Sequence, residues 1–94
     1  MTLNSDEREL LRRISEGSGP VEPPDYFHSI YPPDFPVSAA EDDPRREAWV
    51  ELQLNLCRAY MQLYRRGLVE VVHPADGVRG DMVVITDAGR AALV

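Results

Sequence analysis

The final third of the chain, residues 63–94, constrains the fold most strongly. A helix is expected to end at Gly67, because glycine suits the left-handed position that follows a helix terminus. Two β-rich runs follow, LVEVVH and DMVVIT, separated by a loop that contains proline and glycine. Thr86 then suits the N-cap of a short last helix. We therefore expect a helix, a β-hairpin over residues 68–86 and a helix over residues 87–94.

The segment before this hairpin predicts one long helix over residues 44–66. Asp43 is a suitable N-cap, and Pro44 fits the first helical position. At 100° per residue, the apolar side chains form two stripes that together span roughly 220° of the circumference. The first stripe comprises Trp49, Leu52, Leu56, Tyr60 and Leu63, and the second comprises Val50, Leu54, Cys57, Met61 and Tyr64. The polar side chains expected to face water are Glu47, Glu51, Asn55, Arg58, Gln62, Arg65 and Arg66.

Both stripes are expected to be buried, since covering one Leu or Met side chain contributes about 1.5–3 kcal/mol. A bare row of five such residues would favour aggregation. The first stripe would pack inside the chain. Cys57, on the apolar side of the helix, is expected to be inert packing. The second stripe would pack either against the same helix of a second copy, making a homodimer, or against the proline-rich arm described below.

The beginning of the chain predicts a shorter amphipathic helix over residues 5–16. Ser5 is the expected N-cap, and acidic residues in the first turn favour the helix dipole. Leu10, Leu11 and Ile14 form its apolar stripe.

Residues 17–43 combine two features that rarely occur together. The segment holds six of the eight prolines, which excludes long helices and central strands. It also holds four of the seven aromatic residues, whereas a disordered linker would be poor in them. We therefore expect an ordered arm whose rings lie against the core, with a short helical turn near residues 25–31.

The charge is unevenly distributed along the chain. The net charge is −6, with −7 in residues 1–44 and +1 in residues 45–94. Affinity for nucleic acid comes mainly from neutralising phosphates, so an acidic chain is a poor general match for DNA.

No catalytic, metal or cofactor motif is present, and we expect no enzyme and no cofactor. His28 and His73 lack a second ligand at metal-binding spacing, and Cys57 is the sole cysteine. No glycine-rich phosphate loop follows a strand. A charged N-terminus and the lack of an apolar run of about 18 residues predict a cytoplasmic chain that does not contact the membrane.

A resemblance to a known class of proteins rests on the final third. The residues are Leu63, Arg66-Gly67-Leu68-Val69, Arg79-Gly80-Asp81 and Val84-Ile85-Thr86-Asp87-Ala88-Gly89-Arg90. This run resembles the closing half of bacterial winged-helix regulators of the MarR and PadR type. The resemblance covers about a third of the chain, and it implies a winged-helix fold and DNA binding with an arginine at the wing.

The chain departs from those regulators where they read DNA. They place a helix, a tight turn and a recognition helix before the wing, whereas here a single long helix is expected. Glu47 and Glu51 lie in its N-terminal half, where base-reading residues usually lie, and carboxylates repel phosphates. The arginines that would contact phosphate are Arg45, Arg46, Arg58, Arg65, Arg66 and Arg79. Their alternative role is to solvate the helix end and pair with the acidic arm.

These observations predict an α+β fold in a single domain over residues 1–94. It is a small winged-helix-like domain with a long central helix, a two-stranded wing and an ordered proline/aromatic arm. The expected function is a non-catalytic protein-interaction and dimerisation module, with a homodimer through the second stripe and a protein partner for the exposed surfaces. The alternative function is a DNA-binding transcriptional regulator.

Overall fold

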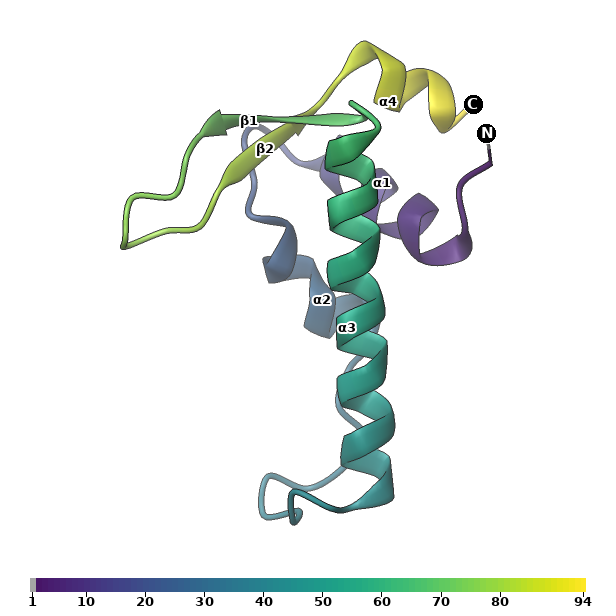
Figure 1. Ribbon diagram of the computed structural model, residues 1–94, viewed down its shortest axis with the longest axis vertical. Helices are drawn as coiled ribbons and strands as arrows, with labels where there is room; N and C mark the ends of the chain where they lie inside the picture. Colours follow the sequence, from purple (N-terminus) through teal and green to yellow (C-terminus); the bar gives the residue numbers. More distant parts are fainter. Residues whose placement is uncertain (1) are drawn as a thin grey trace.

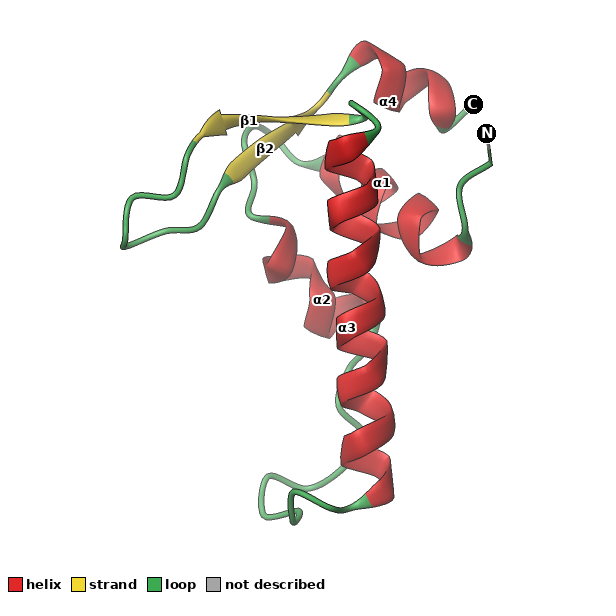
Figure 2. Ribbon diagram, viewed as in Figure 1, coloured by secondary structure: helices red, strands yellow, loops and turns green. Residues whose placement is uncertain are grey.

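The computed structural model describes residues 2–94 as an α+β fold with a long central helix and a two-stranded antiparallel sheet. This arrangement fits the predicted winged-helix-like domain (Figure 1, Figure 2). In chain order the elements are α1 (Ser5–Glu16), the 3-10 helix η1 (Pro23–Tyr26), α2 (Phe27–Ile30), α3 (Pro44–Arg65), β1 (Val69–His73), β2 (Met82–Ile85) and α4 (Asp87–Ala92).

Helix α1 has its predicted bounds, but its N-cap lies one residue earlier than predicted. Asn4, not Ser5, is the N-cap: its side chain accepts from the backbone N–H of Glu7 at 2.8 Å. Glu7 reciprocates by accepting from the backbone N–H of Asn4, also at 2.8 Å. This two-way capping box satisfies two helix-end donors at once, whereas Ser5 as the cap would lack the acidic residue three positions later.

Helix α3 has the start and end that its sequence predicts. The Asp43 side chain accepts from the backbone N–H of Arg45 at 2.8 Å. At the other end Gly67 adopts a φ of 71°, which glycine tolerates without strain. The N–H of Leu68 donates to the carbonyl of Leu63 at 2.9 Å, and both side chains are buried. These contacts make a Schellman motif, which fixes the direction in which the chain enters β1.

The wing is held by more of the chain than its own hairpin. Strands β1 and β2 pair antiparallel, with Val71 opposite Val83. Val21, from the arm, exchanges two backbone hydrogen bonds with Val83 on the other edge of β2, at 2.8 and 3.0 Å. The Glu22 side chain also accepts from the backbone N–H of Gly80 at 2.5 Å. The arm therefore fixes the orientation of the wing against the helices.

The core lies where α1, the C-terminal half of α3 and the sheet meet (Figure 1). The side chains of Leu10, Leu11, Leu56, Leu63 and Val83 have no exposed surface at all. The buried apolar residues are Leu3, Leu10, Leu11, Ile14, Phe27, Leu56, Ala59, Leu63, Leu68, Val69 and Val83. Among the described residues, no buried side-chain polar atom lacks a hydrogen-bond partner.

The N-terminal half of α3 extends beyond this core (Figure 1). The radius of gyration is 14.4 Å, compared with about 12 Å for a compact domain of this length. Within residues 2–94, no helix combines the length and the apolar character that crossing a membrane requires.

Candidate interaction surface

The proline/aromatic arm is an ordered segment that packs on Trp49, in the first apolar stripe of α3. Further along this stripe Leu56 and Leu63 are buried in the core, whereas Leu52, which was expected to be buried, is 37% exposed. Trp49 donates from Nε1 to the carbonyl oxygen of Tyr31 at 2.8 Å. Its ring makes edge contacts with His28 and Phe35, with ring centroids 5.1 and 5.4 Å apart. Phe27 is buried in the core. The arm therefore occupies one side of α3, the side on which α1 packs further along the helix.

The second stripe is left uncovered, and the prediction that α3 is buried on two sides is wrong for a single chain. Its members are between 42% and 55% exposed where they are large, and Cys57 is exposed rather than packed. The alternative in which the arm covers this stripe is also wrong, because the arm packs on Trp49. We name Val50, Leu54, Cys57, Met61 and Tyr64 the α3 stripe.

The α3 stripe has the spacing of a helix–helix seam. Its five residues follow one another at intervals of four, three, four and three. This is the 3.5-residue repeat that keeps apolar side chains facing a second helix, with Leu54 and Met61 at one type of seam position and the other three at the second type. One edge of the stripe carries Glu51, Arg58 and Arg65, and the other carries Arg46, Gln53 and Tyr60.

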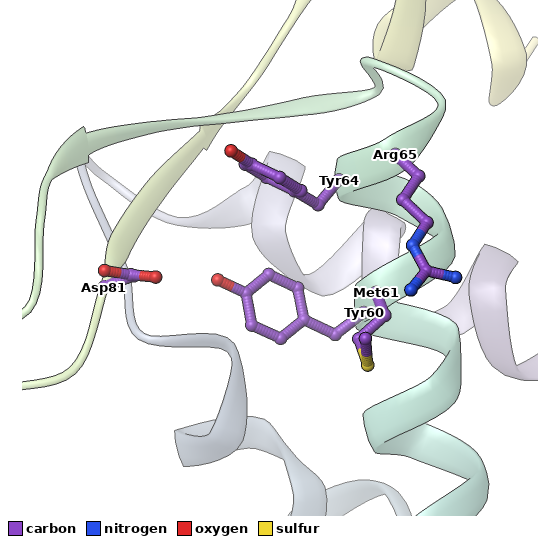
Figure 3. Close-up of a pocket in the computed structure, with 5 residues that line it drawn as sticks. All are labelled: Tyr60, Met61, Tyr64, Arg65 and Asp81. Carbon is purple, nitrogen blue, oxygen red and sulfur yellow. The ribbon is translucent and has the colours of Figure 1, made fainter.

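A shallow hollow adjoins the C-terminal end of the stripe, between α3 and Asp81, the residue that precedes β2 (Figure 3). Its volume is about 290 Å³, and it is lined by Tyr60, Met61, Tyr64, Arg65 and Asp81. Burial, followed by the nearby carboxylate of Asp81, raises the pKa of the Tyr60 hydroxyl. The hollow lies at the lower size limit of small-molecule pockets and suits one inserted apolar side chain better.

One of the proposed DNA-contacting arginines is turned into the structure. Arg66 was expected to face water, but its side chain is only 16% exposed and its Nη1 lies 3.6 Å from the carboxylate of Glu7. Glu7, which takes part in the capping box of α1, is itself buried. A buried carboxylate needs a cationic neighbour, so Arg66 connects the end of α3 to the start of α1.

The other arginines are spread along the molecule, most of them beside acceptor groups. Arg45 pairs with Asp43 at 3.2 Å, and Arg46 donates to the carbonyl of Ala39 at 3.1 Å. Arg58 donates to Asn55 at 2.8 Å and lies 3.5 Å from Glu51. Arg79 is on the exposed wing beside Met82, and Arg65 is exposed at the hollow. Arg45 and Arg65 are separated by 20 helical residues, or about 30 Å, so these side chains do not form one continuous basic patch.

Within residues 2–94 there is no group of three or more His, Cys, Asp or Glu side chains placed to hold a metal ion. His28 lies against Trp49, and His73 ends β1. Neither histidine therefore belongs to a cluster of possible ligands.

Comparisons with protein-family models, curated proteins and solved structures find no match to this chain. A row of half-exposed apolar side chains on a rigid helix, with charges of both signs along its edge, is suited to binding a second helix.

Proposed function

We propose that this protein is a non-catalytic interaction module that forms a homodimer through the α3 stripe. The observation that carries the proposal is the exposure of five apolar side chains at seam spacing on the longest helix. A second copy of the same helix offers an equally long apolar row, and two such rows bury each other.

The size of the exposed surface indicates a reversible dimer. Each stripe residue is already about half buried, so covering the rest contributes roughly 1 kcal/mol per side chain. Summed over two copies, this gain is of the same order as the cost of lost translational and rotational freedom. We therefore expect a weak dimer that dissociates readily on dilution and is best sought at high protein concentration.

Sedimentation velocity over a range of protein concentrations tests this proposal. The wild type should shift from monomer to dimer as its concentration rises, and Met61→Glu should remain monomeric because it places a charge in the seam. Gln62→Glu is the matched control: it adds the same charge one residue along, on an exposed position outside the stripe. A wild type that stays monomeric at several hundred micromolar would refute the proposal.

DNA binding by a winged-helix regulator is the second candidate, and the helix–wing–helix arrangement with its exposed Arg79 favours it. The pairing of Arg66 with Glu7 and the net charge of −6 weigh against it. Titration with duplex DNA at low salt decides between the two. Affinity that falls steeply with salt and weakens in Arg79→Ala would favour the regulator.

A further inference from the structure

We infer that the two α3 helices of the dimer run antiparallel, with Val50 opposite Met61 and Leu54 opposite Cys57 of the second copy. This inference rests on the proposed homodimer and adds the direction and register of the seam. Three observations carry it: the charges at the two ends of the stripe, the charges along its edge, and the residues beyond each end.

The charges at the ends of α3 favour opposite directions. The N-terminal end carries the carboxylates of Glu41, Asp42, Asp43 and Glu47 against the two arginines Arg45 and Arg46, so its net charge is negative. Glu47 lies three residues before Val50, at the next position of the seam repeat. The C-terminal end carries Arg58, Arg65 and Arg66, of which Arg66 pairs with Glu7. Parallel helices would place the N-terminal ends of the two copies together, with Glu47 against Glu47. Antiparallel helices instead place the acidic end of one copy beside the basic end of the other.

The charges along the edge then select the register. When two identical helices pack antiparallel, an edge of one helix faces the same edge of the other. The edge with Glu51, Arg58 and Arg65 therefore faces the same three residues of the second copy, which run in the opposite order. With Val50 opposite Met61, Glu51 of each copy lies near Arg58 of the other, which gives two pairs of opposite charge. The two side chains already approach to 3.5 Å within one helix, so they project over the same edge.

A shift by one heptad gives a poorer seam. It would place Arg58 against Arg58 and would leave Val50 level with Leu68. Leu68 is past the end of α3 and is buried in its own core, so Val50 would have no apolar counterpart. The shifted register also has four apolar layers, Leu54 with Tyr64 and Cys57 with Met61, and it brings Glu51 near Arg65 of the second copy. The chosen register is preferred because it has no like-charge contact on this edge, and it places Tyr64 opposite Glu47.

The parallel arrangement has one favourable pairing, which the structure weakens. It would bring Glu51 near Arg46 of the second copy, because opposite edges meet in parallel helices. The guanidinium of Arg46, however, already donates to the carbonyl of Ala39 at 3.1 Å, and the residue is half-buried. Moving it would cost that hydrogen bond. Arg58 also has a partner, Asn55 at 2.8 Å, but its side chain is 65% exposed and can exchange that bond for one to water.

The antiparallel register also accounts for the hollow beside the wing. Met61 lines this hollow, and in this register Met61 shares a layer with Val50 of the second copy. An apolar side chain inserted there would cover Met61 and the ring of Tyr60. In the single chain Met61 is 50% exposed and Tyr60 is half-buried.

Disulfide trapping distinguishes the two directions. The native thiol is first removed with Cys57→Ala, and then Val50→Cys or Met61→Cys is added in separate chains. In the antiparallel dimer, residue 50 of one chain shares a layer with residue 61 of the other. Each of these residues lies about 16 Å along the axis from the same residue of the second chain, which is too far for a disulfide. Oxidation with diamide should therefore yield no covalent dimer from either chain alone and a covalent heterodimer from their mixture.

The trapping result separates this inference from the proposed function. A wild type that is monomeric by sedimentation overturns both. A dimer in which Val50→Cys or Met61→Cys each links to its own copy overturns only the antiparallel inference. If the protein is a dimer but neither variant alone nor their mixture forms a disulfide-linked dimer, the inference is overturned and the contact lies outside the α3 stripe.

A charge exchange provides an independent check on the register. Glu51→Arg alone and Arg58→Glu alone each create two like-charge contacts, and each should weaken its homodimer about fivefold. A heterodimer of the two variants has opposite charges at positions 51 and 58 across the seam, in both pairs. Within each helix, positions 51 and 58 still carry like charges. Preferential heterodimers in native mass spectrometry support the register, and a statistical distribution of species overturns it.

Discussion

Two leucines of α3, two residues apart, allow the core and the α3 stripe to be separated. Leu56 is fully buried in the core, whereas Leu54 is 45% exposed on the α3 stripe. The same substitution to alanine at each position should therefore have different consequences. Leu56→Ala should destabilise the single chain, and Leu54→Ala should mainly weaken the dimer.

The magnitudes follow from burial. Removing a fully buried leucine side chain costs about 2–5 kcal/mol, because the transfer free energy is lost and a cavity remains. Small domains have about 5–15 kcal/mol of stability in total, so Leu56→Ala should come close to unfolding the chain. Leu54→Ala should cost less than about 1 kcal/mol in the single chain, since the side chain is about half in water and no cavity forms.

Urea denaturation followed by circular dichroism measures both quantities, at a concentration below the dimer midpoint and at one well above it. Leu56→Ala should lower the free energy of unfolding at both concentrations. Leu54→Ala should change it mainly at the higher one, where dimerisation adds to stability. Leu56→Met, which conserves volume, is the control and should cost less than about 1.5 kcal/mol. If Leu54→Ala costs as much as Leu56→Ala in the dilute sample, the assignment of Leu54 to a surface is refuted.

Three further predictions concern the single chain. A Cβ on Gly89 would overlap the carbonyl oxygen of Leu68, so Gly89→Ala should lower the free energy of unfolding by about 1–3 kcal/mol, measured by urea denaturation. Glu7→Ala removes both the capping acceptor and the buried carboxylate, and thermal unfolding should show a loss of about 1–3 kcal/mol. Hydrogen bonds from Arg12, the largest cause, lower the pKa of Glu9. This contribution to stability is therefore complete above the ordinary glutamate pKa and is lost as the pH falls through the lowered value, so Tm should fall as the solution is acidified below the ordinary glutamate pKa, and Glu9→Gln should reduce that fall.

Local sequence signals were sufficient for much of the fold. Asp43 with Pro44 begins α3, Gly67 ends it with a positive φ, and Thr86 caps α4 by accepting from the N–H of Gly89. Each of these features depends on groups within a few residues of one another. Backbone chemistry at that range is encoded locally, which is why sequence reasoning located the helix ends and the wing.

Features that depend on distant segments were missed. The bridge between Val21 and Val83 joins residues 62 positions apart, and nothing in the arm marks Val21 as part of a strand. Arg66 was expected in water because it follows a polar face, but its environment is set by Glu7 at the far end of the chain.

The candidate site was found in part. The residues of the α3 stripe were identified from their periodicity, but periodicity reports which side chains share a face and not what covers that face. Whether the arm lay over Trp49 or over Leu54 depended on how residues 17–43 fold back, which the sequence left open. The structure places the arm on Trp49.

The most direct test of the α3 stripe as a dimer face uses the reactivity of Cys57, the sole cysteine, which is exposed in the single chain and lies in the middle of the stripe. Its reaction rate with excess Ellman's reagent is measured as the protein concentration rises from about 1 to several hundred micromolar, with Met61→Glu measured in parallel. The rate constant should fall as the second copy covers the thiol, and it should stay fast at every concentration in Met61→Glu. A wild-type rate constant that does not change with concentration would contradict the account.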